Sequence, residues 1–256
     1  MLYLNSLSGF LLSNALIVLL SVIAYLLKTK VNDSRLLRII TGVMCLILTV
    51  QTVLTYITFS SDAVHPDFSK ALLVVLISAS VIYAVSLRLE PIARISGAVA
   101  GILVLAVLIA VLTNTGIYSF ANLKAASFDG DFNLCQALKC LDLPLIYLTL
   151  NERTGGKTDK ALFGSIISAY AVSSFLLVFL YLSEGTAFNG YYYPVFELFQ
   201  LSKIGSFSRL DIIFTGSVLL ALFLKCSVLF YCGLYGITGG KYEKNSFNGC
   251  NFNRND

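Results

Sequence analysis

A few polar side chains interrupt the long apolar stretches of this chain, and they are the residues that could bind a ligand. Lys225 lies inside the apolar run LALFLKCSVLFYCG. A charge at the centre of a bilayer costs about 2.5–3.5 kcal/mol on insertion scales, so this ammonium group should face protein or a cavity. It could couple an ion or bind a ligand. Alternatively, it could pair with a carboxylate such as Glu197 or Asp211, or extend toward the membrane surface.

A second group of polar side chains lies earlier in the chain. Gln51, Thr52 and Thr55 bring an amide and two hydroxyl groups within about one helical turn of each other. Such groups suit a small polar ligand, but they also hold membrane helices together at about 0.6 kcal/mol each. Gly97 and Gly101 form a G-x-x-x-G pattern, which usually indicates that two helices approach closely.

The sequence contains no pattern typical of a catalytic or metal site. His65 is the only histidine and lies in a short polar stretch, and the cysteines form no C-x-x-C pair. No glycine-rich phosphate loop lies between a strand and a helix. We therefore expect no enzymatic activity, no metal and no cofactor, and we interpret Asn114 and Asn122 as caps or loop residues. The cysteines, expected to be mostly apolar filler in helices, are Cys45, Cys135, Cys140, Cys226, Cys232 and Cys250.

The elements that must position these residues follow from the composition. Hydrophobic residues make up 57% of the 256 positions and charged residues 12%, whereas soluble domains carry about 25% charged residues. The mean hydropathy is +0.82. A water-soluble fold could not bury so much apolar surface, so we predict an all-α, polytopic membrane helical bundle. The net charge of +4 is scattered, which argues against a nucleic-acid partner and leaves membrane lipid as the surrounding medium.

Apolar runs of about 20 residues are long enough to cross a bilayer as helices. Two weaker segments, 133–150 with Pro144 and 191–202 with Pro194, resemble the discontinuous helices of transporters, or are interfacial helices or loops. About eight membrane segments therefore form a transmembrane domain over 1–238, followed by a polar C-terminal tail over 239–256. The first apolar run shows no signal-peptide cleavage pattern. The six clear spans are 9–27, 36–59, 71–87, 95–113, 161–182 and 211–237.

The basic residues predict an orientation, because cytoplasmic loops retain lysine and arginine. With both weak segments counted as crossings, both termini lie outside, and the polar tail must be translocated with its basic residues. A further helix after the tail would return the chain to the cytoplasm. The predicted cytoplasmic residues are Lys28, Lys30, Arg35, Arg38, Arg88, Arg94, Arg153, Lys157, Lys160, Lys203 and Arg209. The predicted exterior residues are Lys70, Lys124, Lys139, Lys241, Lys244 and Arg254.

Two stretches resemble a known family. The first covers residues 191–211, YYYPVFELFQLSKIGSFSRLD. It combines a tyrosine-proline entry, a short helix and an I-G-x-F turn. An R-x-D/E-like motif then opens a long apolar helix that contains an internal K-C-S. The segment IYAVSLRLEPIARISGAVAGILVLAVLIAVLTNTGIYSFANL contains an E-x-x-A-R loop and a later N-L. In their order along the chain, residues 82–123 and then 191–211, these stretches resemble the spore germination family, the B-type membrane subunits of germinant receptors. That family belongs to the amino acid, polyamine and organocation transporter superfamily.

The resemblance implies a truncated inverted-repeat transporter fold in which the eight segments are similar to helices two to nine, without the first and last helices. It places the ligand-facing surfaces around Thr52, Thr55, Pro144 and Tyr193. Charged residues around Arg94 and Arg209 would set topology and form ion pairs, or contact partner subunits.

Three functions follow as hypotheses. The first is an integral membrane subunit of a germinant receptor that senses a small nutrient such as an amino acid. It would act in the spore inner membrane together with other receptor subunits. The second is an amino-acid secondary transporter, or permease, in which Lys225 or carboxylates couple ion and substrate movement. The third is a truncated paralogue without a ligand.

Overall fold

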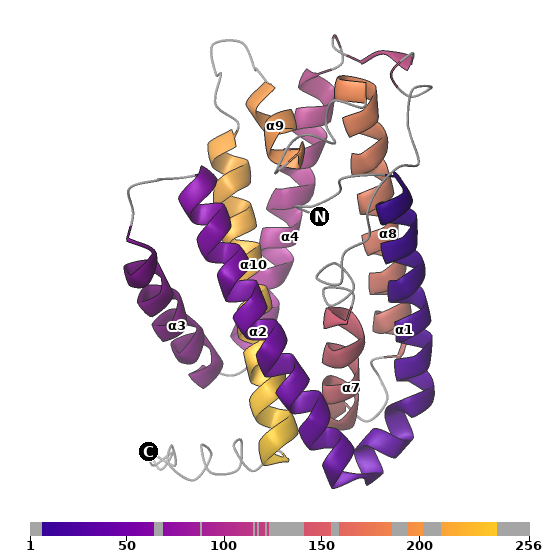
Figure 1. Cartoon of the computed structure of the whole chain (residues 1–256), viewed down its shortest axis with the longest axis vertical. Coiled ribbons are helices and arrows are strands. Elements are labelled where there is room, and N and C mark those ends of the chain that lie inside the picture. Colours follow the sequence, from indigo (N-terminus) through magenta and orange to yellow (C-terminus); the bar gives the residue numbers. More distant parts are fainter. Residues whose placement is uncertain are drawn as a thin grey trace, which may run out of the picture.

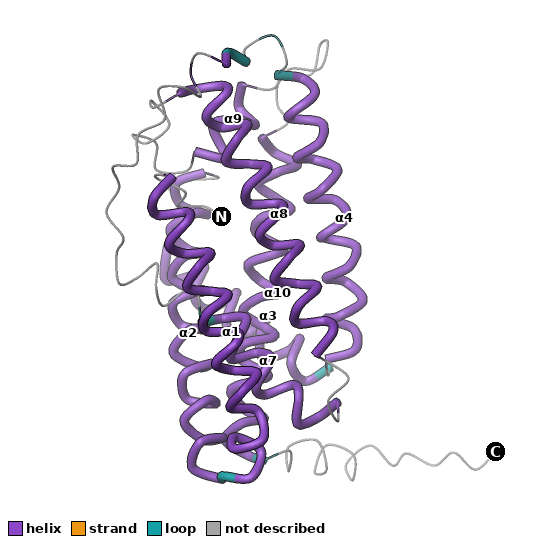
Figure 2. The backbone as a smooth tube through the Cα atoms, turned by 90° about the vertical axis from the view of Figure 1, so that its right-hand side faces the viewer, coloured by secondary structure: helices purple, strands orange, loops and turns teal. Residues whose placement is uncertain are grey.

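The computed structural model describes residues 7–63, 69–87, 89–114, 116, 118–120, 122, 141–154, 159–185, 194–201 and 211–239. Within these ranges the chain is helical and contains no strand, which confirms the predicted all-α class. Figure 2 shows the longer helices running roughly side by side along the long axis. The helices are α1 (Leu7–Asp33), α2 (Arg35–Ala63), α3 (Lys70–Ser86), α4 (Leu89–Thr113), α7 (Asp142–Thr154), α8 (Asp159–Glu184), α9 (Pro194–Leu201) and α10 (Asp211–Thr238).

Four of the described helices are long and apolar enough to cross a membrane, and two further apolar helices are shorter. Large hydrophobic side chains such as Leu26, Leu112 and Ile167 are highly exposed on their outer surfaces. This pattern suits a solvent of lipid chains, so the chain is a membrane-embedded helical protein. The long candidate spans are Arg35–Asp62, Leu89–Thr113, Asp159–Ser183 and Ile212–Thr238, and the shorter helices are Asn14–Thr29 and Lys70–Ser86.

The two proline-bearing segments correct the prediction of eight membrane segments. With 13 residues in α7 and 8 in α9, the helices are about 20 and 12 Å long, less than the roughly 30 Å of a bilayer core. Both prolines lie in the first turn, where a missing N–H leaves no helical hydrogen bond unmade. In Figure 1, α9 lies at the upper end beside the start of α10, and α7 occupies only the lower half.

Because α9 does not cross the bundle, α10 runs from the upper end to the lower end in Figure 1. Its last turn lies beside the first turns of α2: the backbone of Gly239 is close to the guanidinium group of Arg38. Gly239 has a φ of 62° and donates its N–H to the Tyr235 carbonyl oxygen at 2.9 Å, a left-handed cap that ends the helix. The prediction that α10 ends on the exterior side is therefore wrong, since α10 ends where α1 joins α2.

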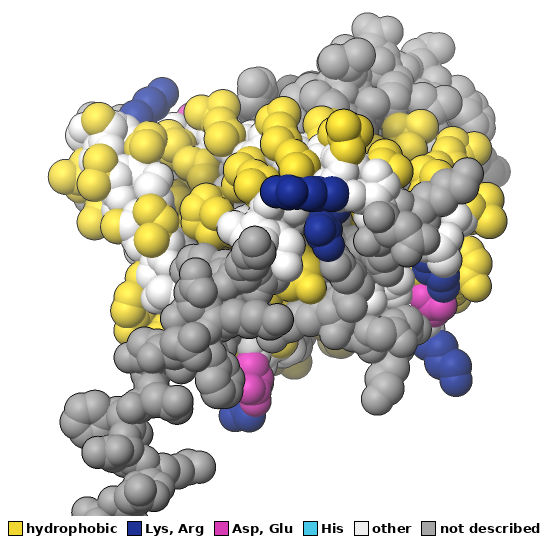
Figure 3. Space-filling view, turned by 90° about the horizontal axis from the view of Figure 1, so that it is seen from below, with side chains coloured by type: hydrophobic (Ala, Val, Ile, Leu, Met, Phe, Trp, Pro, Cys, Tyr) yellow, Lys and Arg dark blue, Asp and Glu magenta, His cyan; other side chains and the backbone are white. Residues whose placement is uncertain are grey.

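This lower end is also where the described basic residues gather. Figure 3, seen from below, shows Lys and Arg side chains on this face and hydrophobic side chains around them. Lys70, by contrast, begins α3 at its upper end. The basic bias agrees with a cytoplasmic lower end. The basic residues with described side chains near the ends of α1, α2, α4 and α8 that lie there are Lys28, Arg35, Arg38, Arg94 and Lys160.

The closest helix contact joins α2 and α10, which pack against each other more extensively than any other described pair. Three glycines make the approach possible. A Cβ atom on Gly42 would lie 2.9 Å from the Gly233 carbonyl oxygen, and one on Gly236 would lie 2.8 Å from the Gly42 Cα. Around this contact the buried Cys45, Leu48 and Leu229 form one core cluster.

Gly97 and Gly101 do not mark such a contact. A Cβ atom added at either position would meet nothing within 4 Å. The G-x-x-x-G pattern on α4 therefore does not serve helix packing among the described residues, and the small residues that do so lie on α2 and α10.

Candidate functional site

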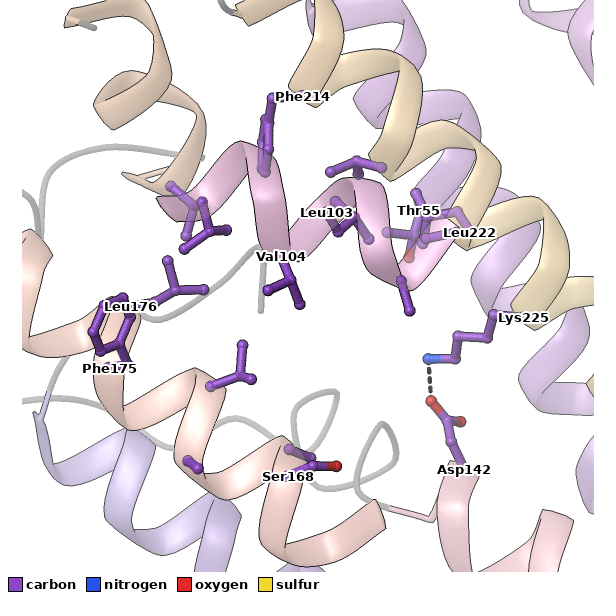
Figure 4. A pocket seen from close by; sticks show the side chains of 18 of the residues that line it. Thr55, Leu103, Val104, Asp142, Ser168, Phe175, Leu176, Phe214, Leu222 and Lys225 are labelled. Carbon is purple, nitrogen blue, oxygen red and sulfur yellow. Dashed lines mark ion pairs between the residues drawn. The ribbon is translucent and has the colours of Figure 1, made fainter. Parts of the chain in front are cut away.

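A cavity of about 880 Å³ lies between α4 and α10 on one side and α8 on the other. This volume is in the range of pockets that hold drug-sized ligands. Figure 4 shows Val104 of α4 facing the cavity, with Phe175 and Leu176 of α8 on the opposite side. Ala100, Leu103 and further aliphatic side chains complete the apolar walls.

The polar end of the cavity is an ion pair between Lys225 and Asp142. Lys225 is in the middle of α10, 14 residues after Asp211 and 13 before Thr238. Its ammonium group points across the cavity edge to the Asp142 carboxylate, as the dashed line in Figure 4 marks. The side chains are 35% and 14% exposed, so both charges remain accessible from the cavity. The expectation that Lys225 faces protein or a cavity is confirmed.

Asp142 reaches this position because α7 begins halfway through the bundle. Figure 1 shows the start of α7 beside the middle of α10. Asp142 is in the first turn of α7, where the N–H groups of the helix end favour a negative charge. Helical bonding starts directly after it, with the Leu145 N–H donating to the Leu141 carbonyl oxygen at 3.0 Å. The helix end and the ammonium group thus both stabilise the carboxylate.

Gln51, Thr52 and Thr55 of α2 line the same cavity. The Thr52 hydroxyl donates to the Leu48 carbonyl oxygen at 2.7 Å, and the Thr55 hydroxyl donates to the Gln51 carbonyl oxygen at 3.0 Å. Because each hydroxyl proton is used within the helix, the oxygens can act toward a ligand only as acceptors. These threonines therefore suit a ligand group that donates hydrogen bonds, such as an ammonium group.

The other end of the cavity is lined by apolar and aromatic side chains of α9 and α10. Val195 and Phe214 line it. The ring of Phe214 stacks on Phe199 of α9, with the centroids 3.9 Å apart, and Phe59 packs edge-on against Phe196 at 6.2 Å. The short helix α9 thus contributes to the apolar end, away from the ion pair.

The wall formed by α8 is fixed to its neighbours at its two ends. At the upper end, the Ser119 N–H donates to the Leu182 carbonyl oxygen at 2.9 Å, and the Asn122 side-chain amide donates to the same oxygen at 3.3 Å. This bond confirms Asn122 as a capping residue. At the lower end, Asp159 accepts hydrogen bonds from Lys28 at 2.6 Å and from the Tyr147 hydroxyl at 2.5 Å. These bonds connect α8 with α1 and α7.

The predicted ligand residues fall into three groups. Thr52 and Thr55 line the cavity. Pro144 is buried in the first turn of α7, outside the cavity lining but two residues from Asp142. Tyr193 lies outside the described residues, as do the side chains of Glu197 and Asp211, the carboxylates first named as partners of Lys225.

Sequence reasoning missed Asp142 as the partner of Lys225. The signal was present: an acidic residue in an apolar segment, two positions before a proline that begins a helix. A carboxylate there lies within the apolar layer and at a helix start.

The described part of the chain contains no cluster of three or more His, Cys, Asp or Glu side chains that could hold a metal ion. Cys45, Cys226 and Cys232 are fully buried in helix contacts and form no disulfide bond, in agreement with the interpretation of cysteine as apolar filler. Cys135, Cys140 and Cys250 lie outside the described residues.

Comparisons with protein families, with curated proteins and with solved structures give no match to this chain. The resemblance to the spore germination family thus remains a prediction from the residues, and the function rests on the cavity and its ion pair.

Proposed function

We propose that this chain is a membrane subunit that binds a small, amino-acid-like molecule in the cavity between α4, α8 and α10. The observation that carries the proposal is the division of the cavity into apolar walls and one charged end. Ligand pockets combine such walls with a few polar groups that fix orientation. An amino acid with an apolar side chain likewise combines an apolar part with a charged end.

The receptor form of this function is the germinant-receptor subunit that the sequence motifs indicate. In this form the ligand is a nutrient, the protein lies in the spore inner membrane, and other receptor subunits receive the signal. The start of α7 in mid-bundle supports a discontinuous-helix arrangement of the transporter type, in which a helix end faces the ligand site. The basic lower end supports a cytoplasmic orientation of that face.

Thermal unfolding of the purified protein in detergent, with each of the common amino acids at increasing concentration, tests binding. At a concentration about 100 times its Kd, a ligand that binds only the folded state stabilises it by about 2.7 kcal/mol. We expect at least one amino acid to give a saturable rise in Tm. Absence of a rise with every amino acid would contradict the proposed function.

A matched pair of variants on α4 locates the binding. Ala100 lines the cavity, whereas Ile102 is 46% exposed and does not. Ala100→Phe should fill the cavity and abolish the ligand-dependent rise in Tm, and Ile102→Phe should retain it. Equal effects of both variants would place the ligand elsewhere.

Deletion of the gene tests the receptor form. We expect germination to be lost or slowed with one or more amino acids as the nutrient. Unchanged germination with every amino acid argues against the receptor while leaving ligand binding to the thermal experiment.

A second candidate function is secondary transport, favoured by the ion pair at the cavity edge. A charged group there could couple ion and substrate movement. Purified protein in liposomes should then take up the stabilising amino acid under an imposed ion gradient, and Lys225→Ala should abolish uptake. Uptake that survives this change removes the mechanism, and no uptake removes the class.

A further inference from the structure

The outer surface where α1 meets α8 combines aromatic rings with lysine side chains near the lower end of the bundle. In Figure 1, α1 runs downward and α8 runs upward beside it. The rings of Tyr25 on α1 and Phe163 on α8 have their centroids 5.8 Å apart. These two residues are 36% and 46% exposed. The ring pair therefore joins the two helices on a surface that faces lipid.

Two lysines lie one helical turn below this ring pair. Lys28 follows Tyr25 by three residues on the descending α1, and Lys160 precedes Phe163 by three residues on the ascending α8. Residues three apart are neighbours on a helix surface, and three residues span about 4.5 Å. The Nζ atom of Lys28 is 4.0 Å from the centroid of the Tyr25 ring, and Lys160 is exposed. Both lysines thus lie between the rings and the cytoplasmic end.

The neighbouring carboxylate of Asp159 holds Lys28 in place without using all of its donors. Asp159 accepts hydrogen bonds from Lys28 at 2.6 Å and from the Tyr147 hydroxyl at 2.5 Å, one on each carboxylate oxygen. The Lys28 ammonium group has three protons and is 20% exposed, so it can donate to a second acceptor. Asp159 balances the charge of Lys28, and Lys160 adds a further positive charge beside them.

The surface above the ring pair is apolar. Val22 lies three residues before Tyr25, and Ile167 lies four residues after Phe163; both are exposed to the lipid side. From the bilayer core toward the cytoplasm, the order is therefore aliphatic, aromatic and basic. A phospholipid presents the matching order of acyl chain, ester region and phosphate. Anionic lipids are concentrated in the cytoplasmic leaflet, and basic sites between membrane helices on that side bind their headgroups.

We propose that this lower α1–α8 surface binds an anionic phospholipid of the cytoplasmic leaflet. Lys160 and Lys28 bind the phosphate group, and one acyl chain lies along the ring pair and Ile167. The bound lipid connects α1 with α8, as the Lys28–Asp159 ion pair does. It therefore stabilises the fold whether or not the cavity holds a ligand.

Thermal unfolding of the purified whole chain in detergent tests this inference with two lipids that share the same acyl chains. Phosphatidylglycerol is anionic, and phosphatidylcholine is zwitterionic. We expect a saturable rise in Tm whose half-maximal mole fraction is at least about fivefold lower for phosphatidylglycerol, since one basic residue near an anionic surface contributes about 1 kcal/mol. Glycerol 3-phosphate supplies the charge without acyl chains and should give no rise. Equal responses to both lipids, a rise with glycerol 3-phosphate, or no rise with phosphatidylglycerol would each overturn the inference.

A pair of charge-removing variants locates the site. Lys160→Gln should raise the half-maximal mole fraction of phosphatidylglycerol about fivefold, and Lys160→Arg should retain the response of the unaltered protein. Arg94→Gln is the matched control, because it removes an exposed positive charge on α4 rather than on α1 or α8. It should leave the phosphatidylglycerol response unchanged. An unchanged response in Lys160→Gln, or an equal loss in Arg94→Gln, would overturn the proposed site.

The same measurements separate this inference from ligand binding in the cavity. Lys160 is outside the cavity lining, so Lys160→Gln should leave any stabilisation by an amino acid unchanged. Loss of the lipid response together with the amino-acid response would overturn the independence of the two sites.

Discussion

Gly236 of α10 lies directly against the backbone of Gly42 of α2. A Cβ atom on Gly236 would be 2.8 Å from the Gly42 Cα and 3.0 Å from the Arg38 carbonyl oxygen, and both atoms belong to the backbone. Gly236→Ala should therefore force the two helices apart and lower the free energy of unfolding by about 1–3 kcal/mol. The midpoint of thermal or denaturant unfolding in detergent measures this change.

Gly97→Ala is the control for this prediction, because a Cβ atom there meets nothing within 4 Å. Alanine also has a higher helix propensity than glycine, so the control should be neutral or slightly stabilising. Equal losses at both positions would show that the α2–α10 contact does not depend on a missing Cβ atom.

The Lys225–Asp142 pair should show strong coupling in a double-mutant cycle. Lys225→Met or Asp142→Leu alone should destabilise the protein by about 1–3 kcal/mol, because the remaining charge loses its ion-pair partner. The double variant should lose less than the sum, since it leaves neither charge of this ion pair without the other.

The exposed Arg94–Glu90 pair, with side chains 79% and 75% exposed, provides the reference cycle. Its coupling should be about 0–1 kcal/mol because water screens both charges. Additive losses at Lys225 and Asp142 would mean that their ion pair contributes no stability.

The course of α10 predicts which positions share a side of the membrane. Single cysteines at Ser34, between α1 and α2, and at Thr238, the last residue of α10, should react with an impermeant maleimide only after cells are permeabilised. A cysteine at Ser69, at the start of α3, should react in intact cells. Labelling of Thr238→Cys from outside would instead restore the eight-crossing topology.

The bonds at the lower end of α8 predict a graded loss of stability. Asp159→Asn removes the ion pair with Lys28 and weakens the bond from Tyr147, whereas Tyr147→Phe removes one hydrogen bond only. The Tm should fall further for Asp159→Asn, and high salt should reduce that difference because it screens the ion pair. Lys160→Gln, at the exposed neighbouring position, should change the Tm little.

The helices themselves could be predicted from the sequence, because an apolar run of bilayer length has few alternatives to a helix. The predicted span 36–59 corresponds to α2 (Arg35–Ala63), and the predicted span 95–113 corresponds to most of α4 (Leu89–Thr113). The proline-bearing segments were ambiguous because a proline fixes where a helix starts but not where that start lies in the bundle. The side of the membrane on which α10 ends depended on that ambiguity.

Partners across helices could be predicted only in part. A lysine in an apolar helix needs a partner or a cavity on energetic grounds, which holds for Lys225. The identity of Asp142 depends on the depth at which α7 begins, a property of tertiary packing. Similarly, Gly42 and Gly236 lie on different helices, so no spacing in the sequence reveals their contact, whereas Gly97 and Gly101 satisfy a local motif without a neighbour.

In this bundle, the residues that hold the helices together differ from those that form one wall of the cavity. The tight α2–α10 contact holds the bundle together on one side of the cavity, whereas the cavity face of α8 forms the opposite wall. Substitutions at positions such as Ala171 or Val172 can therefore reshape the cavity without altering the glycine contact. The cavity face of α8 can therefore accumulate substitutions while the packing of α2 against α10 stays the same.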